Sequence, residues 1–321
     1  MTAGTWTLVG DIGGTHARFA LVRPDSSRLE RTAVLRCADY SGPEAAVADF
    51  LRRARSPDIH GACFAVAAPV AGATVTMTNN HWVFDRQRIL QHFGWQQFRL
   101  VNDYTAMALG ILEVADEYLV PIGRGLPVAN RPKLIIGPGT GLGVSALVPS
   151  GQGWLPLATE GGHVDFAPGD DIEASVLAGL RGRYGRVSVE RLACGPGLVN
   201  LYHQLAAIRG EPSGLNQPED ISAAALAGTD SVAVESLQRF CSILGRVAGN
   251  GVLTLGAYGG VYLCGGMIPS MLPFFLESRF RVEFENKGRM TSLLAATPVW
   301  VVTDPCAGLY GAALALTHPE V

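Results

Sequence analysis

Residues 8–22 read LVGDIGGTHARFALV, and this stretch decides the fold. An apolar run is broken by Asp11, continues into two glycines and a threonine, and then resumes. Glycine lets the backbone turn tightly and lets another group approach it closely. The stretch therefore predicts two strands joined by a turn, with Gly13, Gly14 and Thr15 beside a bound group.

The same arrangement occurs twice more along the chain. Residues 134–148, LIIGPGTGLGVSALV, have the same length and layout, with Gly139, Thr140 and Gly141 at the break. A third strand-like run, residues 260–264, ends in Gly265 and Gly266. Consecutive glycines at strand ends can point backbone N–H groups into a concavity that binds anions. Three such places favour nucleotide phosphates over turn formation alone.

Strand-like runs alternate with helical patterns, which is typical of an α/β protein. The paired turns predict two lobes facing a common cleft: a small lobe of residues 1–112 with 303–321, and a large lobe of residues 113–302. The expected strands lie near residues 6–11, 17–22, 62–67, 98–102, 134–148, 260–264 and 299–303. The expected helices lie near residues 43–55, 103–112, 171–183, 196–208, 221–226, 230–256, 269–280 and 308–316.

Composition restricts the possible partners. The 321 residues carry a net charge of −3, which gives no basic field for nucleic acid. The N-terminus shows no leader pattern and no apolar run is long enough to span a bilayer, so we expect a cytoplasmic protein without membrane contact. Six dispersed cysteines without a C-x-x-C pair predict reduced, mostly buried thiols.

Three common classes of phosphate-binding protein are excluded because the sequence lacks their motifs. The Walker pattern is absent, and GPGTGLG lacks the third glycine of G-x-G-x-x-G because Leu142 stands there. The lysine, H-R-D and D-F-G signatures of protein kinases are also absent. The sequence therefore supports neither P-loop, Rossmann nor protein-kinase chemistry at the glycine turns.

Six segments together resemble the bacterial glucokinase family. The match runs in order from about residue 6 to residue 313, and the segments that carry it are LVGDIGGTHARFALV, VNDYTAMALGI, IIGPGTGLGVSALV, EGGHVDFAP, LACGPGLVNLY and VYLCGGMIPSM. The resemblance implies a two-lobed actin-like (ribonuclease H-like) sugar kinase fold with a central cleft. It also implies ATP-dependent phosphorylation of glucose to glucose 6-phosphate, and a homodimer.

Asp103 is the candidate catalytic base. It follows Asn102 where a predicted strand meets a predicted helix, so its carboxylate has access to a cleft. The resemblance implies that Asp103 takes the proton from the sugar 6-hydroxyl. The structural alternative is an N-cap, because Asn and Asp are both preferred there.

Four residues are candidates for binding glucose by resemblance. Carboxylates, imidazole and amides pair well with sugar hydroxyls, and an unpaired partner penalises the wrong substrate. A metal site at Glu160 and His163 is disfavoured because no second histidine or ligand spacing accompanies them. A solvated surface carboxylate remains the alternative for Glu190. The four candidates are Asn102, Glu160, His163 and Glu190.

Asp11 is the candidate magnesium ligand. A carboxylate beside phosphates repels them unless a cation stands between, and Mg²⁺ is held largely through waters and phosphates. The alternative is an aspartate that takes part in its own turn. The predicted ATP-binding residues are Asp11, Gly13, Gly14, Thr15, Gly139, Thr140, Gly141, Gly265 and Gly266.

Two other functions remain open at this stage. A kinase for another hexose, such as fructose or mannose, would use the same residue types. A non-catalytic sugar-sensing regulator is also possible, because a fold does not fix function. The regulator is less expected, since the first strand begins by about Trp6 and leaves no room for a helix-turn-helix, and Asp103 is present.

Overall fold

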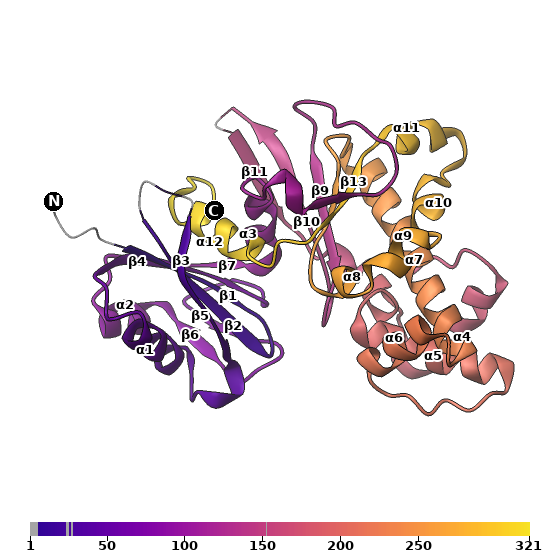
Figure 1. Ribbon diagram of the computed structural model, residues 1–321, viewed down its shortest axis with the longest axis horizontal. Coiled ribbons are helices and arrows are strands. Elements are labelled where there is room, and N and C mark those ends of the chain that lie inside the picture. The colour runs from indigo at the N-terminus through magenta and orange to yellow at the C-terminus, as the bar shows by residue number, and fades with distance from the viewer. Residues whose placement is uncertain (1–5, 24–25, 27, 152) are drawn as a thin grey trace. The chain divides into compact units, whose positions relative to one another are not determined.

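The computed structural model describes residues 6–23, 26, 28–151 and 153–321. The first five residues, where the sequence shows no leader pattern, lie outside the described residues. The chain forms two compact units. Figure 1 colours the chain by residue number, from indigo at the N-terminus to yellow at the C-terminus. The first unit comprises residues 1–115, 150–158 and 304–321, and the second comprises residues 116–149 and 159–303.

The first unit is built on a five-stranded mixed sheet with the order β3-β2-β1-β4-β7. Strands β1 and β2 form the hairpin around the first glycine turn, and β3 pairs with β2, both antiparallel. Strands β1, β4 and β7 run parallel. The strands are β1 (Trp6–Ile12), β2 (His16–Val22), β3 (Leu29–Arg36), β4 (Ile59–Val66) and β7 (Gln97–Asn102).

Helices cover both faces of this sheet (Figure 1). Helices α1 (Pro43–Arg53) and α2 (Arg86–Phe93) lie over a core that includes Phe19, Phe50 and Phe64. Helices α3 (Asp103–Gly110) and α12 (Ala307–Thr317) pack against each other and against β4. The remaining elements are η1 (Cys37–Asp39), the small hairpin β5 (Thr74–Thr76) and β6 (Val83–Asp85), and β11 (Gly153–Ala158), which packs on α3.

Helices α3 and α12 touch through their backbones. A Cβ atom on Gly311 would overlap the carbonyl oxygen of Ala106, and one on Gly110 would overlap that of Ala307. Neither helix can therefore carry a side chain at these points without separating from the other. The contact holds the start of α3 at a fixed place relative to β1 and β4, on which α12 also packs.

The sheet of the second unit contains β10, β9, β12, β13 and β8, in that order. Strands β9, β12 and β13 run parallel, while β10 and β8 pair antiparallel at the two sides. This layout of one hairpin followed by parallel strands is also that of the first unit. The strands are β8 (Leu119–Pro121), β9 (Lys133–Pro138), β10 (Leu142–Ser150), β12 (Val261–Leu263) and β13 (Val299–Val302).

One large apolar core joins this sheet to the helices of the second unit. The long helix α7 lies at its centre and packs against α5, α6 and α10. The helices are α4 (Asp171–Tyr184), α5 (Gly195–Arg209), α6 (Pro218–Ala227), α7 (Ser231–Leu255), α8 (Met267–Ser270), α9 (Leu272–Glu277), α10 (Phe280–Glu285) and α11 (Thr291–Ala296). The short turns of 3₁₀ helix are η2 (Asp116–Tyr118), η3 (Gly161–His163), η4 (Val189–Arg191) and η5 (Gly288–Met290).

The expected α/β fold and its glycine hairpins are confirmed. Both expected strand–turn–strand segments form antiparallel hairpins. All six cysteines are free and five of them are buried, as their spacing predicted. Among the described residues, no helix is both long and apolar enough to cross a membrane.

We predict that Gly311→Ala destabilises the protein, because the new methyl group must push α12 away from the α3 backbone. Overpacking of this kind costs about 1–3 kcal/mol of unfolding free energy. Urea-induced unfolding followed by circular dichroism measures the change.

The matched control is Gly182→Ala in α4, where nothing outside the adjoining residues and the helix's own backbone lies within 4 Å of the new methyl group. This variant should gain about 0.5–1 kcal/mol from helix propensity. A Gly311→Ala protein that unfolds at the wild-type urea concentration would contradict the close helix contact.

Candidate functional site

The first glycine turn is held in place by two residues that sequence reasoning missed. The Gly13 N–H donates to the His16 carbonyl at 2.9 Å, which closes the β1–β2 turn. The Asn80 side-chain amide donates to the Gly13 carbonyl at 3.1 Å, and the Cys37 N–H donates to the Thr15 carbonyl at 2.9 Å. The turn is thereby fixed on both sides.

Asn80 is itself anchored in the core. Its Oδ1 accepts the Trp82 N–H at 2.8 Å, and the buried Trp82 indole donates to the Cys37 carbonyl at 3.2 Å. In the sequence, Asn79 and Asn80 precede His81 and Trp82, and this pattern does not indicate that Asn80 bonds to the Gly13 carbonyl. Asn80 and Cys37 therefore position the turn whose own residues the sequence predicted.

Asp11 lies at the end of β1 and forms an ion pair. Its Oδ2 is 3.3 Å from Nη1 of Arg18, which stands opposite it in the β1–β2 register, and 18% of the Asp11 side chain is exposed. Burial raises the pKa of Asp11 above its ordinary value, and the Arg18 guanidinium opposes that rise. Its carboxyl carbon also lies against Gly308, in the first turn of α12.

Asn102, not Asp103, caps helix α3. The Asn102 Oδ1 accepts the Tyr104 and Thr105 N–H groups at 2.9 and 3.2 Å. Asp103 is the first helical residue, and its Oδ1 accepts hydrogen bonds from the Asn102 side-chain amide and the Tyr104 N–H, both at 3.0 Å. Asn102, and not Asp103, is therefore the N-cap residue of α3. The Asn102 side-chain amide also orients the Asp103 carboxylate.

Asp11 and Asp103 lie at the same edge of the first sheet. Strands β1 and β7 both run parallel to β4, where Ile12 and Asn102 share the register partner Val66. With adjacent strands about 4.8 Å apart, the two strand ends are separated by about 10 Å. In open α/β sheets, ligands bind at the carboxyl ends of the strands.

The two glycine turns of the second unit share one edge as well. Strands β9 and β12 are parallel neighbours, with Ile136 opposite Leu263, so Gly139–Gly141 and Gly265–Gly266 follow adjacent strand ends. The Gly139 N–H donates to the Gly141 carbonyl at 2.8 Å, and Gly139 and Thr140 are exposed. Gly265 has a φ of +89°, a conformation that favours glycine.

The second unit also brings together three of the predicted sugar-binding residues. His163 lies between two carboxylates: its Nε2 is 3.9 Å from Glu160 Oε2, and its Nδ1 is 3.9 Å from Glu190 Oε1. More than half of the Glu160 and His163 side chains is exposed, at 68% and 55%. The cluster thus offers acceptors and an imidazole to an external hydroxylated ligand.

Glu190 is fixed on two sides. Its Oε2 accepts the Leu142 N–H at 2.9 Å, and its backbone carbonyl accepts the Cys194 S–H at 2.9 Å. Burial raises the pKa of Cys194 to about 12, so the thiol keeps its proton at neutral pH. Glu190 is not the freely solvated surface carboxylate that the sequence left open.

The described part of the chain shows no metal cluster built from protein side chains alone. Within the described ranges, no three His, Cys, Asp or Glu side chains are grouped so that they could hold a metal ion. The metal reading of Glu160 and His163, already disfavoured from the sequence, gains no support. Asp11 can offer one carboxylate to a cation, and the remaining ligands must come from water or a bound phosphate.

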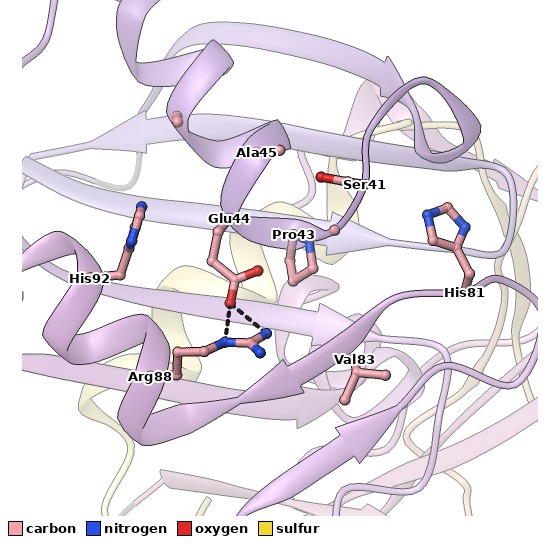
Figure 2. Close-up of a pocket in the computed structure, with 10 residues that line it drawn as sticks. Ser41, Pro43, Glu44, Ala45, His81, Val83, Arg88 and His92 are labelled. Carbon is pink, nitrogen blue, oxygen red and sulfur yellow. Dashed lines mark hydrogen bonds and ion pairs between the residues drawn. The ribbon is translucent and has the colours of Figure 1, made fainter.

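A surface pocket of about 540 Å³ lies elsewhere in the first unit, and none of the predicted site residues lines it (Figure 2). The Glu44 carboxylate and the Arg88 guanidinium meet across it, at 2.7 to 2.8 Å. His81 also lines it, with its Nε2 at 2.9 Å from the Tyr40 carbonyl oxygen. Because the charges on Glu44 and Arg88 neutralise each other, this pocket offers no convergent charge to a ligand.

The two α/β units, with polar residues at the strand ends, match a known class of enzyme fold. The crystal structure of a glucokinase from an Antarctic psychrotroph superposes with a TM-score of 0.86 and is 34% identical in sequence. The match covers 97% of this chain and 98% of that one. The fold is therefore that of the actin-like sugar kinases.

Sequence comparison identifies the family within that class. The Glucokinase family model matches residues 8–319. The glucokinase of Marinobacter nauticus is 57% identical over 321 residues, and that of Hahella chejuensis is 53% identical over the same length, with both chains covered completely. The chain belongs to the glucokinase family.

Proposed function

We propose that this chain transfers the γ-phosphoryl group of ATP to the 6-hydroxyl of glucose, with Asp103 as the general base. The observation that carries the proposal is the 57% identity to a glucokinase along the complete length of both chains. That relationship favours an enzyme over a sugar-sensing regulator, and glucose over fructose or mannose. The predicted site residues give the reaction a mechanism.

Asp103 acts on the attacking hydroxyl. Its carboxylate takes the proton as the sugar oxygen bonds to the γ-phosphorus, while the bond from phosphorus to the β–γ bridging oxygen of ATP breaks and ADP leaves. The Asn102 amide fixes the Asp103 carboxylate through the 3.0 Å hydrogen bond to Oδ1. Phosphoryl transfer of this kind depends on positioning and electrostatics, without a covalent enzyme intermediate.

Glucose is held by Asn102, Glu160, His163 and Glu190. The two carboxylates accept hydroxyl protons, and His163 can donate or accept beside them. The 3.9 Å separations of His163 from both carboxylates support a shared ligand for the three side chains. Because each group is polar and exposed to a ligand, a sugar that lacks a matching hydroxyl leaves one unpaired and binds less well.

ATP is held by the three glycine turns. Neither Gly13 nor Gly139 has a φ between +20° and +160°, and no atom outside the adjoining residues lies closer than 3.7 Å to a Cβ placed on either. The protein's own packing therefore gives no reason for glycine at these positions, which supports close approach of a ligand. The nucleotide-binding set is Asp11, Gly13, Gly14, Thr15, Gly139, Thr140, Gly141, Gly265 and Gly266.

Asp11 fits a magnesium ion that arrives with the nucleotide. Its single carboxylate, partly exposed and only loosely paired with Arg18 at 3.3 Å, suits an ion that takes its other ligands from phosphates and water. Bound there, Mg²⁺ would neutralise charge on the phosphates. We also propose, from family resemblance, that the protein works in the cytoplasm as a homodimer.

A coupled assay of the purified protein tests the activity. ADP formation is measured with glucose, fructose and mannose, each with ATP and Mg²⁺. We expect turnover with glucose to exceed turnover with either other hexose. Glucose binding without turnover would indicate a sensor, and faster turnover with fructose or mannose would indicate a different hexokinase.

We predict that Asp103→Asn binds glucose but loses turnover by on the order of 10²-fold or more, which is the scale of a positioned general base. The amide keeps the size of the side chain and can still accept the Tyr104 N–H, so the start of α3 should remain intact. Calorimetric binding beside initial-rate kinetics separates the two effects. Turnover close to the wild-type rate would remove Asp103 from the role of base.

We predict that Asp11→Asn raises the Mg²⁺ concentration needed for half-maximal rate, because an amide is a weaker ligand than a carboxylate. Glucose affinity should stay unchanged in the absence of nucleotide. A Mg²⁺ titration of the rate at saturating glucose and ATP measures the shift. An unaltered titration curve would exclude Asp11 from the cation site.

A further inference from the structure

Glu190 connects two groups of residues that the proposed function assigns to different substrates. Its carboxylate belongs to the glucose set, yet it is bonded to the end of the turn assigned to ATP. We propose that the β9–β10 turn is a positioning element for sugar recognition, which sets the orientation of the Glu190 carboxylate and hence the affinity for glucose. This inference rests on the proposed function.

The contact is specific to one oxygen of the carboxylate. Glu190 Oε2 accepts the Leu142 N–H at 2.9 Å, directly after the glycine turn and 48 residues away in sequence. A backbone N–H that donates to a carboxylate forms a strong, charge-assisted hydrogen bond. With Oε2 held in this way, Oε1 is the oxygen that lies 3.9 Å from His163 Nδ1, within the sugar cluster.

The absence of a side chain on Gly141 makes this contact possible. A Cβ atom on Gly141 would lie 2.6 Å from Glu190 Oε2 and 3.4 Å from its Cδ, and no other atom outside the adjoining residues would lie within 4 Å. A methyl group there must therefore displace the carboxylate and nothing else. Gly141 leaves the space that Glu190 occupies.

Two further contacts join the same segments. The Gly195 N–H, at the start of α5, donates to the Gly139 carbonyl at 2.8 Å. The preceding residue, Cys194, donates its S–H to the Glu190 carbonyl at 2.9 Å. Hydrogen bonds thus join the turn, η4 and the start of α5, which fixes the backbone on both sides of the Glu190 side chain.

Two alanine variants of the same turn provide the test. Gly141→Ala places a methyl group against Glu190, whereas the methyl group of Gly139→Ala meets no atom outside the adjoining residues within 4 Å. Neither glycine has a φ between +20° and +160°. Glucose binding is measured by calorimetry without nucleotide, so a direct effect on ATP cannot contribute. We expect Gly141→Ala to bind glucose about tenfold more weakly, the scale of one lost hydrogen bond to a charged group. Gly139→Ala should bind it as the wild type does.

A double-mutant cycle shows whether the effect passes through Glu190. If it does, Gly141→Ala should change glucose affinity in the wild-type background and not in a Glu190→Ala background. Equal weakening in both backgrounds would overturn the positioning role. The positioning role would also be overturned if Gly141→Ala bound glucose with the wild-type affinity. It would be overturned as well if Gly139→Ala weakened glucose binding as strongly as Gly141→Ala does.

The controls separate this inference from the proposed function. A wild-type protein that does not bind glucose would overturn the proposed function and the inference together, whereas normal glucose binding by Gly141→Ala would overturn the inference alone. Gly141→Ala should fold, because the new methyl group meets only the end of the Glu190 side chain and no backbone atom outside the adjoining residues. Its melting temperature should fall only by the small amount that the lost Leu142–Glu190 hydrogen bond contributes. A variant that does not fold would contradict that geometry.

Discussion

The backbone contact between α3 and α12 is the constraint on which the functional edge of the first unit depends. Helix α3 begins with Asp103, and the first turn of α12 lies against Asp11. The other end of α12 is held by Arg99 of β7, which donates to the Ala315 and His318 carbonyls at 2.6 and 2.8 Å. The proposed base and the proposed cation ligand are thereby placed by the same pair of helices.

In the second unit, hydrogen bonds between loops hold the candidate site residues in place. In the first unit, the contact between α3 and α12 does so. The Leu142 and Gly195 N–H groups join the β9–β10 turn to the segment that carries Glu190, and both donate to acceptors far away in the sequence. A loop bonded in this way loses little further freedom when a ligand arrives, so more of the contact energy appears as affinity. Preorganisation therefore extends from the sheets to the exposed residues that we propose contact the substrates.

Helices and strands that have a regular apolar pattern, or that end in glycines, could be predicted from the sequence. Those with a weak apolar pattern could not. Strand β3 is an edge strand with several exposed side chains, and α2 buries only Ile89, so neither shows a clear apolar pattern. At the site, residue types at strand ends indicated Asp11, Asp103 and the glycine turns. The partners Asn80 and Leu142 could not be found, because their contacts exist only after distant segments have packed.

The central claim is that Asp103, at the first position of α3, accepts the proton from the sugar 6-hydroxyl. A crystal structure with glucose and a non-hydrolysable ATP analogue tests it most directly. We predict an Asp103 carboxylate oxygen within about 3 Å of the 6-hydroxyl oxygen, the reach of a general base. A different basic side chain at that hydroxyl, with Asp103 beyond the reach of even one bridging water, would contradict the account.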